Sequence, residues 1–463
     1  MNVLFCVFWC TLWLSTSAYN SSIIELVGNG VQHLTFLSHK SQYNIVKNKW
    51  FEQELDHFNI TDTRTWKQRY HMNLKYYKMG GPVFLMVGGR EEISPSWMIS
   101  GAWIEYAQLF NAACFQLEHR FYGMSHPTDN LNTSNLVYLT VEQVLADLGT
   151  FINTISIKKK KLLDDAKWVG FGSSYSASLV TWLRLKYPHL VHAAVSSSSL
   201  LKAKINFEEY FIAVQKQLSD YDPKCEFHIR QANKMINDQL KTDYGAKYIQ
   251  NKFNTCAHHL HNSTKNVQQL FRDMSKFIGL IVQDNEDDRY YDKIIEESTV
   301  TLVTLCDIMS NETLGTTVNR QWLYQTCTEL GFFQTSNQDH HLFGNTVSLE
   351  YFTDLCIDVF GKSFNLNTLS KAVNKTNIMY GGSKPRVSRI VFVRGSIDPW
   401  NPLGLSFLPI NSSTILIEGT SHCADIDSYS SDPSQLSEAR VDILMYLKKY
   451  LSEEDFSIEP ILL

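Results

Sequence analysis

The chain lacks several features that would assign it at once to a class of protein. Lys and Arg number 42 against 47 Asp and Glu, which gives a net charge of −5. The basic excess of a nucleic-acid-binding protein is therefore missing, and we expect no nucleic-acid partner. After the first 18 residues no stretch has the length and apolar purity of a membrane-spanning helix, so we expect no membrane partner either. Hydrophobic residues make up 44% of the 463, enough for a large core, which excludes intrinsic disorder and collagen-like fibres.

The first 18 residues contain no charged side chain and carry an apolar run from Val3 to Leu14. This run is too short to span a bilayer but is typical of the core of a signal peptide. The small residues Ser17 and Ala18 offer a cleavage site before Tyr19. The segment predicts entry into the secretory pathway and a secreted or lysosomal location.

The N-glycosylation sequons and the cysteines are consistent with the secretory pathway. Cys6 and Cys10 leave with the signal peptide, and an odd number of cysteines remains, so we expect disulfides and at least one unpaired thiol. Cys114 lies in an apolar, strand-like run and is the predicted unpaired thiol. Seven N-x-S/T sequons are candidate glycan acceptors, at Asn20, Asn59, Asn132, Asn262, Asn311, Asn374 and Asn411.

The order of apolar runs predicts an α/β fold. From residue 81 to 200, short apolar runs alternate with helical stretches, as in a parallel sheet. Strand character returns after residue 389. The expected strands are 82–87, 112–117, 168–171, 193–197, 389–393 and 414–417, and the expected helices are 141–155, 176–187 and 435–451.

Between these two stretches the character of the chain changes. The segment from residue 206 to about 380 carries longer helical runs and five of the remaining cysteines. The simplest organisation is one sheet interrupted by a helical insertion. We therefore expect a signal peptide at 1–18, the first part of the sheet domain at 19–200, a helical cap at 201–385 and the second part of the sheet domain at 386–463.

A metal site is the less favoured interpretation of the histidines. Their spacing lacks a helical i, i+4 pair with a partner Glu or Cys, so surface or packed histidines are expected, with neither metal nor other cofactor. The histidines concerned are His258, His259, His261, His340 and His341.

A nucleophilic serine is predicted in the strand–turn–helix segment at 168–179. A nucleophile elbow turns so sharply that small residues are needed on both sides of an exposed serine. Ser174 alone among the competing serines has a glycine two residues before it, Gly172, and a small residue two after it, Ser176. Ser176 stands where the G-x-S-x-G pattern has its second glycine. Taken alone, the motif leaves a serine-rich turn without catalytic function equally open.

Two later residues provide the partners that a nucleophilic serine needs. Asp398 follows the strand expected at 389–393, and His422 follows the strand expected at 414–417. The order Ser174, Asp398, His422 is that of the α/β hydrolases, in which the base and its orienting carboxylate follow late strands. Each residue also has a structural explanation as a loop side chain. The order and the positions at strand ends together favour a catalytic triad.

Six separated motifs lie between roughly residues 50 and 430. These are W-F-E-Q-E-L-D-H-F at 50–58, E-H-R-F-Y-G-M-S at 118–125, G-S-S-Y-S-A-S-L at 172–179, Q-T-C-T-E-L-G-F-F-Q at 325–334, G-S-I-D-P-W at 395–400 and S-H-C-A-D at 421–425. Through these motifs the chain resembles the family of Pro-X carboxypeptidase, dipeptidyl peptidase II and thymus-specific serine protease, with the thymus-specific branch the most similar.

The resemblance implies an α/β-hydrolase fold with a helical cap and a serine exopeptidase that cleaves short peptides next to proline. Ser174 would be the nucleophile, His422 the general base and then acid, and Asp398 the residue that orients it. The backbone N–H of Tyr175 and one from Gly89 or Arg90 would form the oxyanion hole.

Other implications of the resemblance stay open. Trp400 and Trp322 would wall an apolar pocket for a proline ring, although a packing role is equally open for each. Arg90 and Glu91 could hold opposite ends of a peptide, so carboxypeptidase and aminodipeptidase specificity are both left open. The substrate would be a peptide, and a homodimer is left open.

Three residues depart from the family's pattern: Ser173 and Ala177 replace glycines at the elbow, and Arg90 replaces a glutamate. These changes motivate one alternative, a catalytically impaired relative that acts as a binding protein. A second alternative is an α/β hydrolase that acts on esters.

Overall fold

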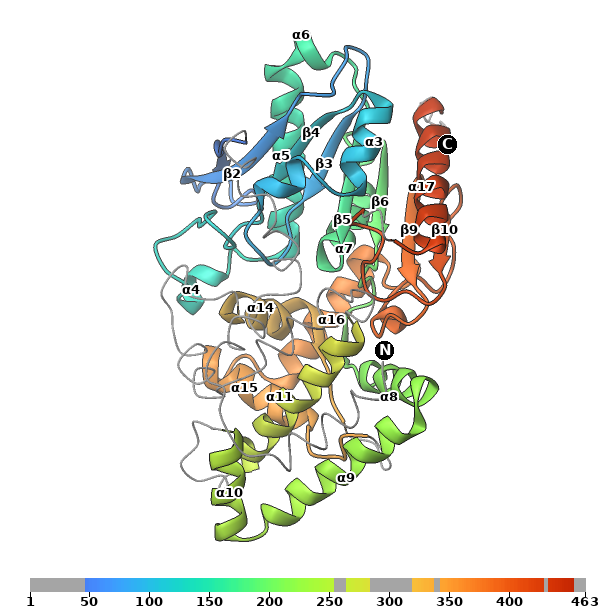
Figure 1. Cartoon of the computed structure of the whole chain (residues 1–463). Helices are drawn as coiled ribbons and strands as arrows, with labels where there is room; N and C mark the ends of the chain where they lie inside the picture. The colour runs from blue at the N-terminus through green and yellow to red at the C-terminus, as the bar shows by residue number, and fades with distance from the viewer. Residues whose placement is uncertain (1–45, 254–263, 284–318, 337–341, 429–431, 454–463) are drawn as a thin grey trace, which may run out of the picture. The chain divides into compact units, whose positions relative to one another are not determined.

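The computed structural model describes residues 46–253, 264–283, 319–336, 342–428 and 432–453. The expected signal peptide lies outside these residues. The chain divides into two compact units (Figure 1), and each is described by itself. We call residues 36–202, 376–396 and 403–463 the sheet unit, and residues 203–375 and 397–402 the helical unit.

The sheet unit is built on eight strands in the order β1-β2-β4-β3-β5-β6-β9-β10. Strands β1 and β2 pair with each other antiparallel, β2 pairs antiparallel with β4, and all pairs from β4 to β10 are parallel. The strands are β1 (Lys49–Glu54), β2 (Thr65–Asn73), β3 (Val83–Val87), β4 (Ala113–Leu117), β5 (Trp168–Ser173), β6 (Ala193–Ser197), β9 (Ile390–Gly395) and β10 (Ser413–Ile417).

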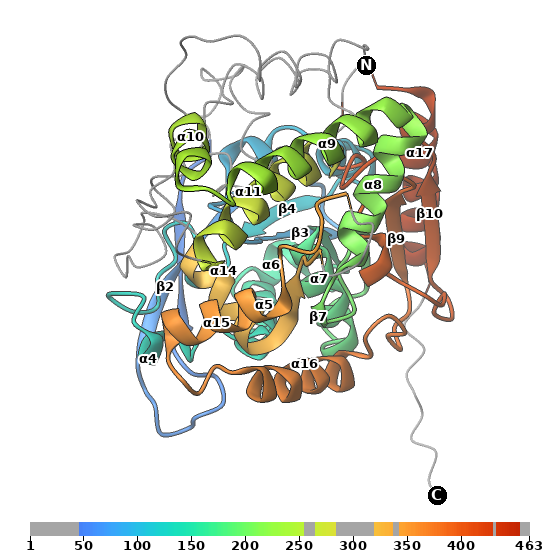
Figure 2. The ribbon, with the colours of Figure 1, turned by 90° about the horizontal axis from the view of Figure 1, so that it is seen from below.

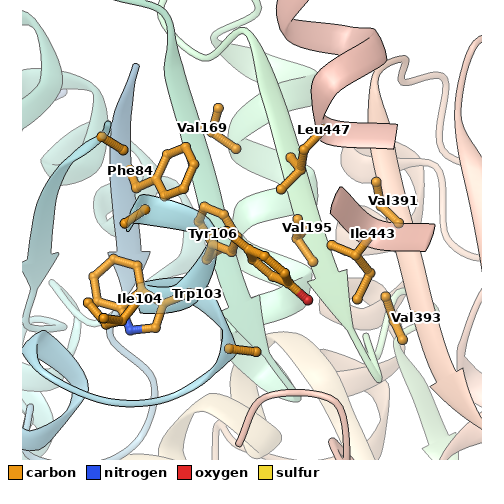
Figure 3. Close-up of a cluster of buried hydrophobic side chains, with 14 of the residues drawn as sticks. Phe84, Trp103, Ile104, Tyr106, Val169, Val195, Val391, Val393, Ile443 and Leu447 are labelled. Carbon is orange, nitrogen blue, oxygen red and sulfur yellow. The ribbon is translucent and has the colours of Figure 1, made fainter. Parts of the chain in front are cut away.

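Helices cover both faces of this sheet, which is why its central strands β5 and β6 are buried along their whole length. On one face, α3 (Ala102–Phe110) and α17 (Ser434–Ser452) pack on alternate residues of the parallel strands (Figure 3). Val169 and Val195 of the sheet lie in this core, as does Ile443 of α17.

On the other face lie α5 (Val141–Lys158) and α7 (Tyr175–Lys186). Phe151 of α5 packs edge-on against Phe51, Tyr70 and Phe115 of three neighbouring strands. Helix α7 lies so close that a β-carbon added at Gly170 would come within 2.2 Å of Val180. The sheet unit also contains the short helices η3 (Pro95–Met98), α4 (Thr133–Leu136) and α6 (Lys160–Leu163).

The helical unit is joined to the chain between β6 and β9. Helix α8 packs against both α9 and α11 (Figure 2). A disulfide joins Cys327 to Cys356, and a parallel pair of short strands, β7 and β8, brings residues 204–206 beside 331–333. Its elements are β7 (Lys204–Asn206), α8 (Glu209–Tyr221), α9 (Pro223–Gln239), α10 (Asp243–Phe253), α11 (Thr264–Gln283), α14 (Asn319–Gln325), the π-helical η6 (Thr326–Leu330), β8 (Gly331–Phe333) and α15 (Leu349–Phe360).

Two elements span the boundary between the units: α16 (Leu366–Tyr380), whose last turn belongs to the sheet unit, and η7 (Asn401–Leu403). In the sheet unit, Tyr380 of α16 stacks on Trp182 of α7 with ring centroids 4.6 Å apart. The end of α16 is thereby tied to the sheet just before β9.

This topology confirms the predicted fold class. An eight-stranded, mostly parallel sheet with one antiparallel strand near its edge and helices on both faces is the α/β-hydrolase fold, and a helical unit interrupts it after β6. All six predicted strands and all three predicted helices are present, with ends that differ by a few residues. The predicted unpaired thiol, Cys114, is free and buried in β4, and Cys423 is free as well.

The antiparallel strands β1 and β2 were not predicted. Their side chains are alternately buried and exposed, and the buried set includes polar residues such as Gln53 and Gln68. Hydrophobic runs therefore do not mark these strands, because side-chain hydrogen bonds replace part of the apolar contact.

Candidate active site

Ser174 occupies the turn between β5 and α7 with an unusual backbone conformation. Its φ is 53° and its ψ is −121°, a region that L-residues rarely adopt. Its amide N–H donates to the carbonyl of Ser197 at the end of β6, at 2.9 Å. The side chain is partly exposed, while its neighbours Ser173 and Tyr175 are buried. This is the geometry of a nucleophile elbow, in which strain at one residue presents its side chain beyond the carboxyl end of a strand.

The elbow closes through two small residues on either side of Ser174. A β-carbon at Gly172 would lie 2.3 Å from the carbonyl oxygen of Ser176, so only glycine fits there. The hydroxyl of Ser176 accepts from the amide of Ser173 and donates to its carbonyl, both at 2.9 Å. The serine at the second glycine position of the motif therefore fits the turn and holds the strand end to the helix.

The loop after β3 lies beside this elbow. A β-carbon at Gly89 would be 3.8 Å from that of Ser176, an ordinary van der Waals contact. Tyr175 is the first residue of α7, so its N–H is one of those that helix geometry leaves without an intrahelical partner. The structure thus brings two of the predicted oxyanion-hole residues to one elbow. Arg90 lies close enough to the buried hydroxyl of Tyr122 to lower its pKa, although burial raises that pKa overall.

His422 lies in the loop after β10, and β6 connects this loop to the elbow. The hydroxyl of Ser198 accepts from the amide of Cys423 at 3.0 Å, while the preceding carbonyl, that of Ser197, accepts from Ser174. Two consecutive residues at the end of β6 therefore hold both the nucleophile turn and the histidine loop. The structure brings Ser174 and the loop of His422 to the same edge of the sheet.

The buried carboxylate of Asp425, in the same loop as His422, anchors this loop to β6. Asp425 accepts a hydrogen bond from the hydroxyl of Ser197. Burial raises the pKa of Asp425, while Ser197, Arg440 and the nearby His422 act to lower it. At Gly395, the last residue of β9, an added β-carbon would lie 2.2 Å from the carbonyl oxygen of Thr420. The histidine loop is thus packed directly on the end of β9.

Asp398 follows β9 by three residues, in the segment 397–402 that belongs to the helical unit. Its side chain is only 3% exposed. One carboxylate oxygen accepts from the amide of Trp400 at 2.9 Å, and its carbonyl accepts from the amide of Asn401 at 3.2 Å. These hydrogen bonds fix the turn. The role of Asp398 in a catalytic triad stays a prediction.

Trp400 and Trp322 belong to one aromatic cluster of the helical unit. The ring of Phe332 lies 6.2 Å from that of Trp400 and 6.4 Å from that of Trp322. Phe207 and Tyr210 pack on Trp400 at 5.4 and 5.2 Å. Phe332 follows the π-helix η6 and has a φ of +64°, so strained backbone sets its ring between the two tryptophans. Whether they form a substrate pocket stays a prediction.

Sequence reasoning missed the residues that organise the site from behind. Ser197 and Ser198 belong to none of the motifs found in the sequence, and Asp425 was given no role although it ends the motif at 421–425. The roles of all three depend on which loops β6 contacts. The available signal was the run of four serines at 196–199, which begins within the strand predicted at 193–197.

The residues that the structure describes contain no group of three or more His, Cys, Asp or Glu arranged to hold a metal ion, and the five histidines considered above lie outside them. Across the same described ranges, no helix combines the length and the apolar character needed to cross a bilayer.

The chain is similar to known proteins over most of its length. The family model for serine carboxypeptidase S28 matches residues 53–319 and 311–443. A putative serine protease of Caenorhabditis elegans is 32% identical over 90% of this chain and 91% of that protein. The thymus-specific serine protease of Homo sapiens is 30% identical, covering 87% of this chain and 86% of its own. Lysosomal Pro-X carboxypeptidase of Mus musculus is 23% identical, covering 87% and 88%. A solved structure of a Saccharomyces cerevisiae monoglyceride lipase variant aligns with a TM-score of 0.38 and 11% identity, covering 88% of this chain and 96% of that one.

Proposed function

This chain belongs to the serine carboxypeptidase S28 family and is therefore a serine-type peptidase, and we propose that it is an exopeptidase that cleaves short peptides next to proline. The observation that carries the proposal is the backbone of Ser174, held at positive φ at the end of β5 with Gly89 beside the same turn. A family of serine peptidases needs an exposed nucleophilic serine, and Ser174 has the geometry for one.

In the proposed mechanism, Ser174 attacks the scissile carbonyl while His422 takes its proton. Asp398 orients His422 and stabilises the imidazolium that forms. The N–H of Tyr175 and one from Gly89 or Arg90 donate to the oxyanion of the tetrahedral intermediate. The intermediate then expels the amine, which receives the proton from His422. Water hydrolyses the remaining acyl-enzyme by the same steps in reverse order.

Two observations support proline as the residue next to the cleaved bond. One is the aromatic cluster around Phe332, because flat aromatic faces suit the rigid, apolar pyrrolidine ring. The other is the similarity to a Pro-X carboxypeptidase, a protein whose name states that preference. In the proposed arrangement Trp400 and Trp322 flank the ring of the bound proline.

A fluorophosphonate probe, which reacts with activated serines, tests the nucleophile. We expect the wild-type protein and Ser173→Ala to be labelled and Ser174→Ala to remain unlabelled. Ser173 is the matched control because it is the adjacent serine but lies buried within β5. Labelling that persists in Ser174→Ala would remove Ser174 from the mechanism, and an unlabelled wild type would favour a binding protein.

A peptide-library digest read by mass spectrometry, with an ester panel beside it, tests the substrate class. We expect cleavage next to proline at one end of short peptides, and inert esters. The library contains peptides blocked at either end, so the same digest reports whether a free carboxylate or a free amine is required. Cleavage without regard to proline would overturn the proposed specificity while leaving the serine peptidase in place.

We also propose that the protein passes through the secretory pathway. The apolar segment at 3–14, the disulfide between Cys327 and Cys356, and the exposed sequon asparagines Asn59, Asn374 and Asn411 support this route. A Pro-X carboxypeptidase relative is named as lysosomal. Expression in eukaryotic cells should yield a product whose mass falls after glycosidase treatment. A cytosolic product of unchanged mass would contradict the route.

A further inference from the structure

Three consecutive ionisable residues follow β4 and are almost completely buried: Glu118 is 0%, His119 2% and Arg120 0% exposed. Burying an ionisable side chain costs free energy unless each of its polar atoms has a hydrogen-bond or ion-pair partner. The partners of these three residues therefore indicate which parts of the structure they hold in place. We propose that Glu118 and His119 are positioning residues that hold the two backbone donors of the oxyanion hole in place. This inference rests on the proposed function.

The first donor lies on the loop after β3, and the segment at Leu117–Glu118 fixes both ends of that loop. At its beginning, the amide of Gly88 donates to the carbonyl of Leu117 at 2.9 Å. At its end, the amide of Ile93 donates to a carboxylate oxygen of Glu118 at 3.1 Å. Gly89 and Arg90, the candidate donors, lie between these two anchors. Their backbone positions therefore depend on Glu118.

Arg69 of β2 strengthens the second anchor. Its guanidinium donates to Glu118 at 2.5 Å, to the carbonyl of Ile93 at 3.3 Å and to the carboxylate of Glu92 at 2.8 Å. The loop after β3 is thus bonded both to Glu118 and to the arginine that Glu118 holds.

The remaining contacts of Glu118 prevent its carboxylate from turning. Its second oxygen accepts from the hydroxyl of Ser125 at 2.6 Å and from the amide of Met124 at 3.0 Å. A β-carbon at Gly123 would lie 2.0 Å from the other oxygen, so the chain itself closes around the carboxylate. Such a fully occupied acceptor is rigid, which is the property that a positioning group for a transition state requires.

The second donor is the N–H of Tyr175, and His119 holds the side chain of that residue. Nδ1 of His119 lies 2.7 Å from the carbonyl of Arg120, which can only accept, so Nδ1 carries the hydrogen. Nε2 is then an acceptor and receives the hydrogen bond of the Tyr175 hydroxyl at 3.3 Å. Burial lowers the pKa of His119 to about 4, so the neutral ring keeps this arrangement at neutral and mildly acidic pH.

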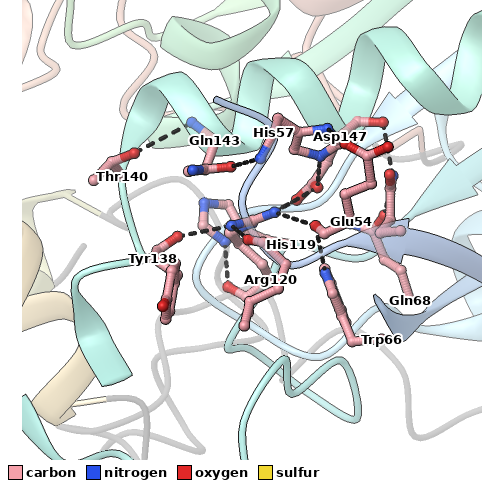
Figure 4. A network of polar contacts seen from close by, with 12 residues as sticks. Glu54, His57, Trp66, Gln68, His119, Arg120, Tyr138, Thr140, Gln143 and Asp147 are labelled. Carbon is pink, nitrogen blue, oxygen red and sulfur yellow. Dashed lines mark hydrogen bonds and ion pairs between the residues drawn. The ribbon is translucent and has the colours of Figure 1, made fainter. Parts of the chain in front are cut away.

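Arg120 provides a control for Glu118 because its side chain contacts another part of the sheet unit. Its guanidinium pairs with both oxygens of Asp147 at 2.7 Å and donates to the carbonyls of Leu55 and Tyr138 (Figure 4). Glu118 and Arg120 are equally buried and equally charged in magnitude, but only Glu118 contacts the loop after β3. A variant at Arg120 therefore reports the stability effect of disturbing a buried ion pair in this motif.

The test compares Glu118→Gln and Tyr175→Phe with the control Arg120→Lys. Tyr175→Phe keeps the backbone N–H and the aromatic ring but removes the hydroxyl that donates a hydrogen bond to His119. This second variant keeps the proposal testable if Glu118→Gln folds poorly. For each protein, three quantities are measured: the rate of fluorophosphonate labelling, the thermal unfolding temperature, and the affinity for a peptide boronate relative to that for the cleaved peptide product.

We expect labelling by Glu118→Gln and Tyr175→Phe to slow about 10-fold or more, since losing one oxyanion donor altogether costs about 100- to 1,000-fold. The boronate, which mimics the tetrahedral intermediate, should lose affinity by a similar factor while product affinity stays unchanged. Arg120→Lys should lower the unfolding temperature and leave the labelling rate and the boronate-to-product ratio near wild type.

Two results would overturn the inference: wild-type labelling rates in both test variants, or a loss of rate in all three proteins that follows their loss of thermal stability. Failure of the proposed function is distinguishable, because the wild type would then not be labelled or Ser174→Ala would be.

Discussion

Gly172 is the residue whose replacement the turn after β5 tolerates least. Its neighbour across the turn is the backbone carbonyl of Ser176, which cannot move without shifting the first turn of α7. A flexible side chain would give way to an added methyl group, but backbone does not. The conformation of Ser174 therefore depends on the absence of a side chain two residues before it.

We predict that Gly172→Ala lowers the free energy of unfolding by about 3 kcal/mol, the upper range for overpacking, and abolishes fluorophosphonate labelling. The matched control is Gly89→Ala, whose added methyl group would make only an ordinary contact at 3.8 Å. Its free energy of unfolding should change little. Urea unfolding of both variants measures the difference, and a Gly172→Ala protein as stable as the wild type would contradict the crowding described at this turn.

At the scale of single residues, the sequence predicts the candidate catalytic residues better than the residues that hold them in position. Ser174 was found because a sharp turn needs small residues at fixed offsets, a local requirement that the sequence displays. Ser197 and Ser198 contact Asp425 and Cys423 of the histidine loop only because β6 lies between β5 and β9, and that neighbourhood is a property of the folded sheet.

At the scale of elements, Asp147 of helix α5 is a buried carboxylate that binds both the chain after β4 and the chain after β1. Asp147 of α5 pairs with Arg120 and lies 2.7 Å from Nε2 of His57. The amide side chain of Gln53 in β1 donates to the carbonyl of Asp147 at 2.8 Å. Polar contacts thus add to the packing of Phe51 on Phe151 in holding the motif at 50–58 to the helix.

We predict that Asp147→Asn lowers the free energy of unfolding by about 3–5 kcal/mol at neutral pH, because Arg120 is left as a buried charge without its partner. Burial by itself would raise the pKa of Asp147, but Arg120 and His57 outweigh it and the pKa is lowered. The unfolded chain therefore takes up the proton first as the pH falls. The stability that Asp147 contributes is complete above its ordinary pKa and is lost as the pH falls below it.

Denaturant unfolding of wild type and variant between pH 3 and 8 checks this prediction. The difference between them should be constant from pH 8 to about 5 and shrink below about pH 4. Asp62→Asn is the control, because Asp62 pairs with Arg64 at the surface and should contribute little. A difference in unfolding free energy that grows as the pH falls would contradict the lowered pKa of Asp147.

The same polar attachment explains which elements the sequence predicts. Strands β3, β4, β5, β6 and β9 are almost entirely buried because helices cover both faces of the sheet, and their short apolar runs made them recognisable. The strand β2 buries Gln68, Arg69 and His71, whose partners lie on distant segments. No local pattern reveals such partners.

At the scale of the whole molecule, the two units differ in how they are cross-linked. The helical unit contains the disulfide between Cys327 and Cys356. In the described part of the sheet unit, Cys114 and Cys423 are free. The sheet unit depends on its apolar core for stability, whereas the helical unit has a covalent link between η6 and α15.

We predict that Cys327→Ala together with Cys356→Ala lowers the stability of the helical unit by about 3.6 kcal/mol, the chain-entropy value for a loop closed across 29 residues. Scanning calorimetry should show one unfolding transition shifted and the other, belonging to the sheet unit, nearly unchanged. Cys423→Ala removes a free thiol and is the control for the loss of a cysteine. Equal shifts in both transitions would contradict the assignment of the disulfide to one unit.

The position of the helical unit in the chain has a consequence for biosynthesis. In the finished sheet β6 lies between β5 and β9, yet β9 is translated only after the whole helical unit. At about 5–20 residues per second, the ribosome needs about 10–40 s to pass from Ser197 to Ile390. Throughout that interval β6 is an open edge on a nascent sheet. Its sequence, Ala193-Ala194-Val195-Ser196-Ser197, is small and weakly hydrophobic, which makes it a poor template for aggregation while it waits for its partner.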